Sequence, residues 1–256
     1  ARRTGDFDDE ATHLKRIFEL EPSPLTLRAA TAALNRAGRY RQSLDLLELN
    51  PELAEIDRLL NAVRGGALAG LGQGEEAQLA FDEAAAACRT LSQATMVADH
   101  MVRALGRDEA ITRLESSMHA RNEVVLGLAL ATQELKGGNS ASGLNRLKQI
   151  ESRLPEHSAH RHALNRKLAM ALHVAKDHEA AREAYARVIR KNPNDVVALT
   201  NLAQLLSEAM SLHEEAMQHI QTAATMAPKS PQVLYTLGCI QYRLGEWGPA
   251  EEALRR

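Results

Sequence analysis

Histidine side chains are the first candidates for chemistry in this sequence. His157, His160 and His162 lie close together along the chain, and imidazoles at this density could bind zinc, which takes about four ligands. Their i, i+3, i+5 spacing does not place all three on one face of a helix, and no Cys or Asp joins them. We therefore interpret this group as a solvated linker, and His213 and His219 as surface residues. The sequence predicts no metal site.

Nucleophilic and phosphate-binding chemistry is equally poorly supported. Cys239 has no histidine expected beside it, whereas an activated nucleophile needs a base within hydrogen-bond reach. Glycines cluster at Gly65-Gly66 and Gly70–Gly74, but no Lys-Ser/Thr pair follows them, as a phosphate-binding loop requires. We read them as close helix contacts and turns. The sequence predicts no catalytic residue and no cofactor, so we do not expect this chain to be an enzyme.

Composition excludes several other classes of function. The 31 basic and 33 acidic residues are mixed along the chain and leave a formal net charge of -2, so there is no basic stripe for nucleic acid. The longest apolar stretch, 124–131, falls far short of the roughly 20 residues that a membrane span needs. Aromatics make up only 3% of the chain, and the apolar share leans on Ala and Leu, the most favourable helix formers. We expect an all-α fold.

Three markers repeat with one period and indicate how the helices are arranged. Leu168-Ala169, Leu202-Ala203 and Leu237-Gly238 recur every 34 or 35 residues, as do Ala181, Ala216 and Ala250. A small side chain is needed where two helices cross, because packed axes lie only about 8–10 Å apart. Pro193 and Pro228 share the spacing and cannot continue a helix interior. The pattern predicts stacked helical hairpins.

These residues resemble the tetratricopeptide repeat (TPR). The resemblance is sharp over the last third of the chain and looser before it, and the closing segment is similar to the closing repeats of large bacterial TPR scaffold proteins. It implies an α-solenoid, a right-handed superhelix of antiparallel hairpins, forming a single array over residues 1–256. The expected units are 1–23 (partial), 24–50, 58–91, 93–121 (degenerate), 124–157, 162–195, 196–230 and 231–256 (truncated). Both ends would thus fall within a repeat.

The family places the first helix of each hairpin along the concave side, where a peptide or partner protein would bind. We therefore expect a protein-interaction scaffold, and the resemblance assigns the partner-binding positions to first helices. These positions are Arg166, Met170, His173, Thr200, Asn201, Gln204, Tyr235 and Tyr242. Arg and Tyr are enriched among binding hot spots, so Arg166, Tyr235 and Tyr242 are the expected anchors.

Alternatives to a plain scaffold remain. The array could be the substrate-recruiting arm of a larger glycosyl- or sulfotransferase, or part of an envelope or exopolysaccharide-export assembly. Open ends of the solenoid could also mediate self-association. The sequence predicts a soluble segment without nucleic-acid partners and does not choose between cytoplasm and periplasm; Cys88 and Cys239 read as small core residues.

Overall fold

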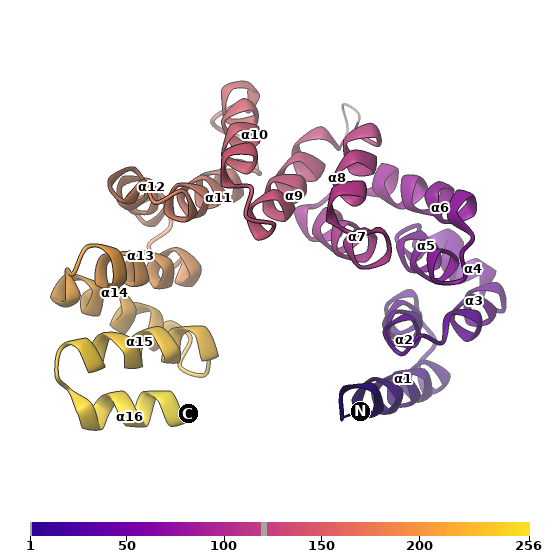
Figure 1. The fold of residues 1–256 in the computed structure, drawn as a ribbon, viewed down its shortest axis with the longest axis horizontal. Helices are drawn as coiled ribbons and strands as arrows, with labels where there is room; N and C mark the ends of the chain where they lie inside the picture. The colour runs from indigo at the N-terminus through magenta and orange to yellow at the C-terminus, as the bar shows by residue number, and fades with distance from the viewer. Residues whose placement is uncertain (1, 119–121) are drawn as a thin grey trace. The chain divides into compact units, whose positions relative to one another are not determined.

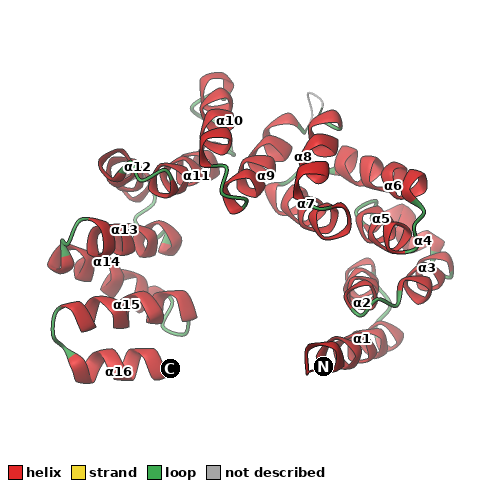
Figure 2. Ribbon diagram, viewed as in Figure 1, coloured by secondary structure: helices red, strands yellow, loops and turns green. Residues whose placement is uncertain are grey.

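The computed structural model describes residues 2–118 and 122–256, in which every regular element is an α-helix (Figures 1 and 2). Sixteen helices follow one another in these ranges, joined by short turns. The predicted all-α class built from consecutive helical hairpins is confirmed. The chain divides into two compact units, residues 1–137 (unit 1) and 138–256 (unit 2).

Unit 1 contains nine helices in its described residues, with hairpins at α2–α3, α5–α6 and α7–α8. Its helices are α1 (Arg2–Leu20), α2 (Pro24–Arg36), α3 (Tyr40–Glu48), α4 (Pro51–Ile56), α5 (Leu60–Gly70), α6 (Gly74–Ala87), α7 (Leu91–Leu105), α8 (Arg107–Ser116) and α9 (Glu123–Lys136). The short α4 begins at Pro51, where the sequence predicted that a hairpin is cut short. Helix α9 packs on α7 and α8.

Unit 2 contains one leading helix and three hairpins. Its helices are α10 (Ser140–Arg153), α11 (Arg161–Val174), α12 (His178–Lys191), α13 (Val196–Ala209), α14 (His213–Met226), α15 (Pro231–Arg243) and α16 (Trp247–Arg255). Each hairpin packs against the next through α12 on α13 and α14 on α15. The first helices α11, α13 and α15 also contact in that order.

Side chains at the helix starts explain where the helices begin. Ser23 and Thr90 each form a capping box with the residue three positions on. Asp177 and Asp195 accept hydrogen bonds from backbone N–H groups in the first turns of α12 and α13. Such caps satisfy donors that have no partner within the helix. Pro231 occupies the first turn of α15, where its missing N–H costs nothing.

The turn inside each hairpin requires one residue with positive φ. Gly72 and Gly245 supply it in the α5–α6 and α15–α16 turns, because glycine has no Cβ to clash in this conformation. Lys176 and Ser211 adopt the same conformation without being glycine. The repeat geometry therefore overrides the residue's own preference in the α11–α12 and α13–α14 turns.

Small residues at the helix crossings confirm the packing argument made from the period. Ala181, Ala216 and Ala250 are all buried. In unit 1 a Cβ on Gly65 would lie 2.9 Å from the ring of the buried Phe81, so glycine is needed at that crossing. The helices of each hairpin thus bury a narrow apolar layer where they pack, which we call a seam, and the buried clusters extend from one hairpin to the next.

The structure bears on two of the repeat units expected from the sequence, 124–157 and 93–121. The boundary between units 1 and 2 falls after residue 137, inside the interval 124–157. The last three residues of the interval 93–121 lie outside the described residues, as does residue 1. That the whole chain forms a single array of the eight expected units stays a prediction.

Candidate functional site

The predicted binding positions lie on three neighbouring helices of unit 2, α11, α13 and α15. Arg166, Met170 and His173 are spaced four and three residues apart on α11 and so share one face of that helix. Tyr235 and Tyr242 are seven apart on α15 and share a face in the same way. We call the exposed surface of α11, α13 and α15 formed by these positions the first-helix face.

Arg166 is engaged within the unit. Its guanidinium lies 3.3 Å from a carboxylate oxygen of Asp195, the buried residue that caps α13. The imidazole Nε2 of His162 lies 2.7 Å from the same carboxylate. Arg166 therefore ties α11 to the start of α13 and is only partly available to a ligand.

Met170 and His173 continue the face along α11. Met170 is 37% exposed, a high value for a large apolar side chain. The His173 ring packs edge-on against Tyr185 and His178, with centroids 6.3 and 6.5 Å apart. Burial, together with His178, lowers the pKa of His173, which favours a neutral imidazole on this face.

Helix α13 contributes polar groups to the face. Thr200 is buried and donates its hydroxyl hydrogen bond to the carbonyl of Val196, so it does not reach the surface. Asn201 is half-buried, and its side chain partly offsets the rise in the pKa of Tyr185 that burial causes. The amide of Gln204 donates to the carboxylate of Glu208 at 3.0 Å. Asn201 and Gln204 are thus the predicted positions of α13 that present side chains.

Helix α15 contributes the exposed aromatic side chains of the first-helix face. Tyr235 and Tyr242 are 55% and 59% exposed. The ring of Tyr242 packs edge-on against Trp247 with centroids 4.8 Å apart, a geometry favoured by aromatic pairs. A hydrogen bond with Cys239, with Glu208 nearby, raises the pKa of Tyr235. The phenol of Tyr235 is therefore a protonated donor at neutral pH.

Glu208 is a carboxylate close to the face that was missed from the sequence. Its charge acts on His173 of α11 and on Tyr235 of α15. The guanidinium of Arg243 donates to the hydroxyl of Ser207 at 3.1 Å and lies 4.0 Å from the Glu208 carboxylate. Glu208 stands seven residues after Asn201, on the same side of α13, and that spacing was the signal available.

The residues considered for metal binding and nucleophilic chemistry have the following surroundings in the structure. Among the described residues, no three His, Cys, Asp or Glu side chains are grouped so that they could hold a metal ion. His162, interpreted as part of a solvated linker, instead bonds Asp195. Burial raises the pKa of Cys88 to about 11, which keeps this thiol protonated and inert. Within residues 2–118 and 122–256, no helix is long and apolar enough to span a membrane.

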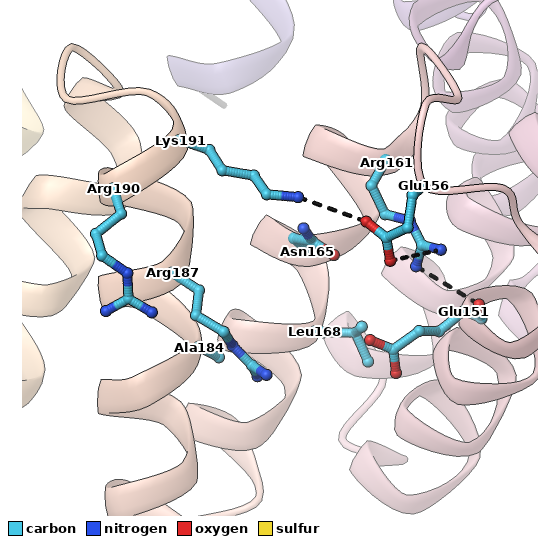
Figure 3. A pocket seen from close by; sticks show the side chains of 9 residues that line it. All are labelled: Glu151, Glu156, Arg161, Asn165, Leu168, Ala184, Arg187, Arg190 and Lys191. Atoms are coloured by element: carbon cyan, nitrogen blue, oxygen red, sulfur yellow. Dashed lines mark hydrogen bonds and ion pairs between the residues drawn. The ribbon is translucent and has the colours of Figure 1, made fainter.

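A second set of residues missed from the sequence lines a cleft at α10, α11 and α12, away from the first-helix face (Figure 3). Its cations are Arg161, Arg187, Arg190 and Lys191. The available signal was the i, i+3, i+4 spacing of the last three, which places them on one side of α12.

Comparison with known proteins agrees with this architecture. Residues 162–205 match the tetratricopeptide repeat family. A tetratricopeptide repeat protein from Parabacteroides merdae is 13% identical, with a TM-score of 0.58, over 100% of this chain and 92% of its own. The Cut9–Hcn1 hetero-tetramer of the APC/C is 14% identical, with a TM-score of 0.53, over 92% of this chain and 46% of that one.

The crystal structure of MamA is 19% identical, with a TM-score of 0.50, over 62% of this chain and 90% of its own. At these identities the likeness concerns the fold. No curated protein matches the chain by sequence. Residues 162–205 thus match a tetratricopeptide repeat, and the successive helical hairpins of the chain share the fold of solved tetratricopeptide repeat proteins.

Proposed function

We propose that unit 2 binds a segment of a partner protein on the first-helix face. Tetratricopeptide repeats are typically protein-interaction scaffolds and are generally non-catalytic. The observation that carries the proposal is the pair of tyrosines on α15, each more than half exposed. Tyrosine combines a large apolar surface with a polar tip, and it is enriched at the energetic centres of interfaces.

Polar groups next to the tyrosines would fix the orientation of a bound segment. Gln204 and Glu208 offer acceptors on α13, and the phenol groups of Tyr235 and Tyr242 offer donors. Extended peptides need such groups, because their backbone N–H and C=O must find partners when water is removed. Met170 adds an adaptable apolar contact on α11. The face therefore presents both the apolar area and the hydrogen-bonding groups that peptide recognition requires.

The energy available from the tyrosines is sufficient for specific binding. Covering roughly 100 Å² of apolar surface on one ring contributes about 2.5 kcal/mol. Loss of both rings should therefore cost more than a tenfold change in Kd, since each 1.4 kcal/mol is a factor of ten. Arg166 is assigned a smaller share, because its charge is already balanced by Asp195.

The experiment starts from peptides selected against the full 256-residue chain from a displayed random library. The Kd of a selected, fluorescently labelled peptide is then measured for the parent chain and for Tyr235→Ala with Tyr242→Ala. We expect the double variant to bind at least about tenfold more weakly, with an unchanged far-ultraviolet circular dichroism spectrum.

Two exposed apolar residues of unit 1 provide the matched control. Ile56 and Leu79 are 74% and 65% exposed, so Ile56→Ala with Leu79→Ala removes a comparable amount of exposed apolar surface elsewhere. This control should leave Kd within about twofold. Peptides that bind the folded tyrosine double variant as tightly as the parent would refute the proposed face.

A further inference from the structure

The cleft at α10, α11 and α12 is a separate feature of unit 2, with a volume of about 350 Å³. Leu168 and Ala184 form its apolar floor, and Asn165 lies beside them (Figure 3). On α11, Arg161, Asn165 and Leu168 follow a four- and three-residue spacing. At 100° per residue this stripe lies about 140° around the helix from Arg166, Met170 and His173. The cleft and the first-helix face therefore lie on different sides of α11.

A departure from the repeat explains why this seam is not filled. Thirty-four residues after Asn165, α13 has the buried Leu199, and a further 35 residues on, α15 has the buried Leu234. Both leucines are almost fully buried, at positions equivalent to Asn165. Asn165 is half-buried and supplies less apolar volume, so space remains above Leu168.

The cleft is positively charged, although the chain as a whole is slightly negative. Four cationic side chains line it, against the carboxylates of Glu151 and Glu156, whereas the formal charge of the chain is -2. Arg187 and Arg190 form no hydrogen bond or ion pair through their side chains with any described residue, and Figure 3 shows them without a partner. The cleft thus holds uncompensated guanidinium groups above an apolar floor.

One carboxylate of the chain already occupies part of the cleft. Glu156 lies 3.2 Å from the guanidinium of Arg161 and 3.5 Å from the ammonium of Lys191 (Figure 3). Arg161 is only 8% exposed, and it also donates hydrogen bonds to the carbonyls of Leu154 and Glu151. Its Nε is buried without a partner. Glu156, which is itself exposed, shows that this mouth accommodates a carboxylate between cations of α11 and α12.

We propose that this cleft is a second binding site, which takes acidic side chains of a partner protein. A partner carboxylate pairs with Arg187 and Arg190, and a second one replaces Glu156 at Lys191. Guanidinium groups suit carboxylates because they donate two parallel hydrogen bonds. Nucleic acid fits less well, because Glu151 and Glu156 would repel a continuous phosphate backbone and no aromatic residue lines the cleft for base stacking.

These cations also have an effect that requires no ligand, and the experiment has to separate the two. Arg190 and Lys191 lie in the last turn of α12, where positive charge interacts favourably with the helix dipole. Substitution of a residue with only that role would alter stability without altering ligand binding. Binding and stability are therefore measured on the same variants.

The probe is a fluorescein-labelled hexaglutamate peptide, with hexalysine as its counterpart, titrated by fluorescence anisotropy with the full chain at 50 mM and 200 mM NaCl. We expect hexaglutamate to bind and hexalysine not to bind, with affinity falling at the higher salt concentration because exposed charges are screened. Arg187→Gln with Arg190→Gln should weaken hexaglutamate binding at least about fivefold. Lys148→Gln with Lys229→Gln, two exposed lysines outside the cleft, removes the same charge and should change Kd less than about twofold.

Glu156→Gln gives an effect of opposite sign. Freed from their internal carboxylate, Arg161 and Lys191 should bind hexaglutamate more tightly, by about twofold to fivefold. Pyrophosphate and a single-stranded oligothymidylate serve as competitors. Three outcomes would each overturn the proposal. They are an equal loss of hexaglutamate affinity in the two double variants, weaker hexaglutamate binding by folded Glu156→Gln, and binding of oligothymidylate in the cleft without binding of hexaglutamate. If Arg187→Gln with Arg190→Gln fails to fold by circular dichroism, the gain expected for Glu156→Gln still decides it.

Discussion

Replacement of Asp195 tests the physical account of how one hairpin is joined to the next. Asp195 is only 3% exposed through its side chain, and its carboxylate serves three partners at once. It accepts a hydrogen bond from the Ala198 N–H at 3.0 Å, and it lies 2.7 Å from His162 and 3.3 Å from Arg166. Asp195→Ala removes both the cap of α13 and the link to α11. Asp195→Asn keeps a capping oxygen and removes the charge.

The two substitutions should differ in cost. Loss of an N-cap destabilises by about 1 kcal/mol, and Asn caps nearly as well as Asp. The links to His162 and Arg166 are discounted because both partners are about one-third exposed; together they contribute about 1–1.5 kcal/mol. We therefore expect Asp195→Ala to lower the free energy of unfolding of unit 2 by about 2–2.5 kcal/mol, and Asp195→Asn by about 1–1.5 kcal/mol.

The cost of Asp195→Ala should also depend on pH. Burial by itself raises the pKa of Asp195, but the hydrogen bonds from Ala198 and His162 and the charge of Arg166 outweigh it, so the pKa is lowered on folding. A lowered folded-state pKa stabilises above the unfolded pKa of about 3.9, and this stabilisation is lost as pH falls through the folded-state value. The difference between parent and Asp195→Ala should therefore be full near pH 7 and shrink below about pH 4.

Urea unfolding followed by circular dichroism gives the free energies, and hydrogen exchange resolved by peptide locates the loss. The amides at the start of α13 should lose protection first in Asp195→Ala, because the Ala198 N–H loses its acceptor. Equal costs for the alanine and asparagine variants, both below about 0.5 kcal/mol, would show that neither the cap nor the charge pairing joins these hairpins.

Three further predictions concern other sites. Gly65→Ala should destabilise unit 1 by about 1–3 kcal/mol, because the new Cβ meets the buried Phe81 ring. A Cβ at Gly248 meets nothing within 4 Å, so Gly248→Ala should stabilise unit 2 by about 0.5–1 kcal/mol. Urea unfolding measures both changes in the free energy of unfolding. Burial, aided by nearby arginines, lowers the pKa of His100 to about 4, so stability should fall as pH drops from about 6.5 towards 4, by up to about 1.4 kcal/mol per pH unit, and a His100→Gln variant should lose that slope. Because the pKa of Cys88 is raised to about 11, its thiol should stay unlabelled by a thiol reagent at pH 8 until urea unfolds the chain, as peptide mass mapping will show.

The features predicted correctly from the sequence are those whose surroundings recur in every hairpin. Ala181, Ala216 and Ala250 are all buried at equivalent positions of their hairpins, so the same small side chain returns at the same spacing. Lys176 and Ser211 show the limit of this reasoning. Both residues have positive φ in their turns. Their residue types do not predict this backbone conformation, which is indicated only by the equivalent turns of neighbouring hairpins.

Contacts between non-equivalent residues could not be predicted in the same way. Arg166 and Asp195 are 29 positions apart, so their pairing depends on individual substitutions that the repeat does not require. Arg166 was assigned to partner binding from the resemblance and from the enrichment of Arg at hot spots, and neither carries information about the caps of the next helix. Glu156 and Lys191 likewise meet because a loop and a helix end happen to be adjacent in this one hairpin.

Helix α11 illustrates how one departure from the repeat can create a surface with different chemistry. On the first-helix face, α11 continues the pattern of α13 and α15 and presents Met170 and His173, and the charge of Glu208 acts on His173. Its packing side follows the repeat at Leu168 but departs from it at Asn165, and there the seam beside α12 holds a cleft lined by cations. Because the core of a hairpin array is a series of narrow seams, replacing one apolar side chain affects mainly its own seam and leaves the neighbouring ones packed. The sites where this chain differs most from its own repeat are therefore the places to look for functions that the repeat does not supply.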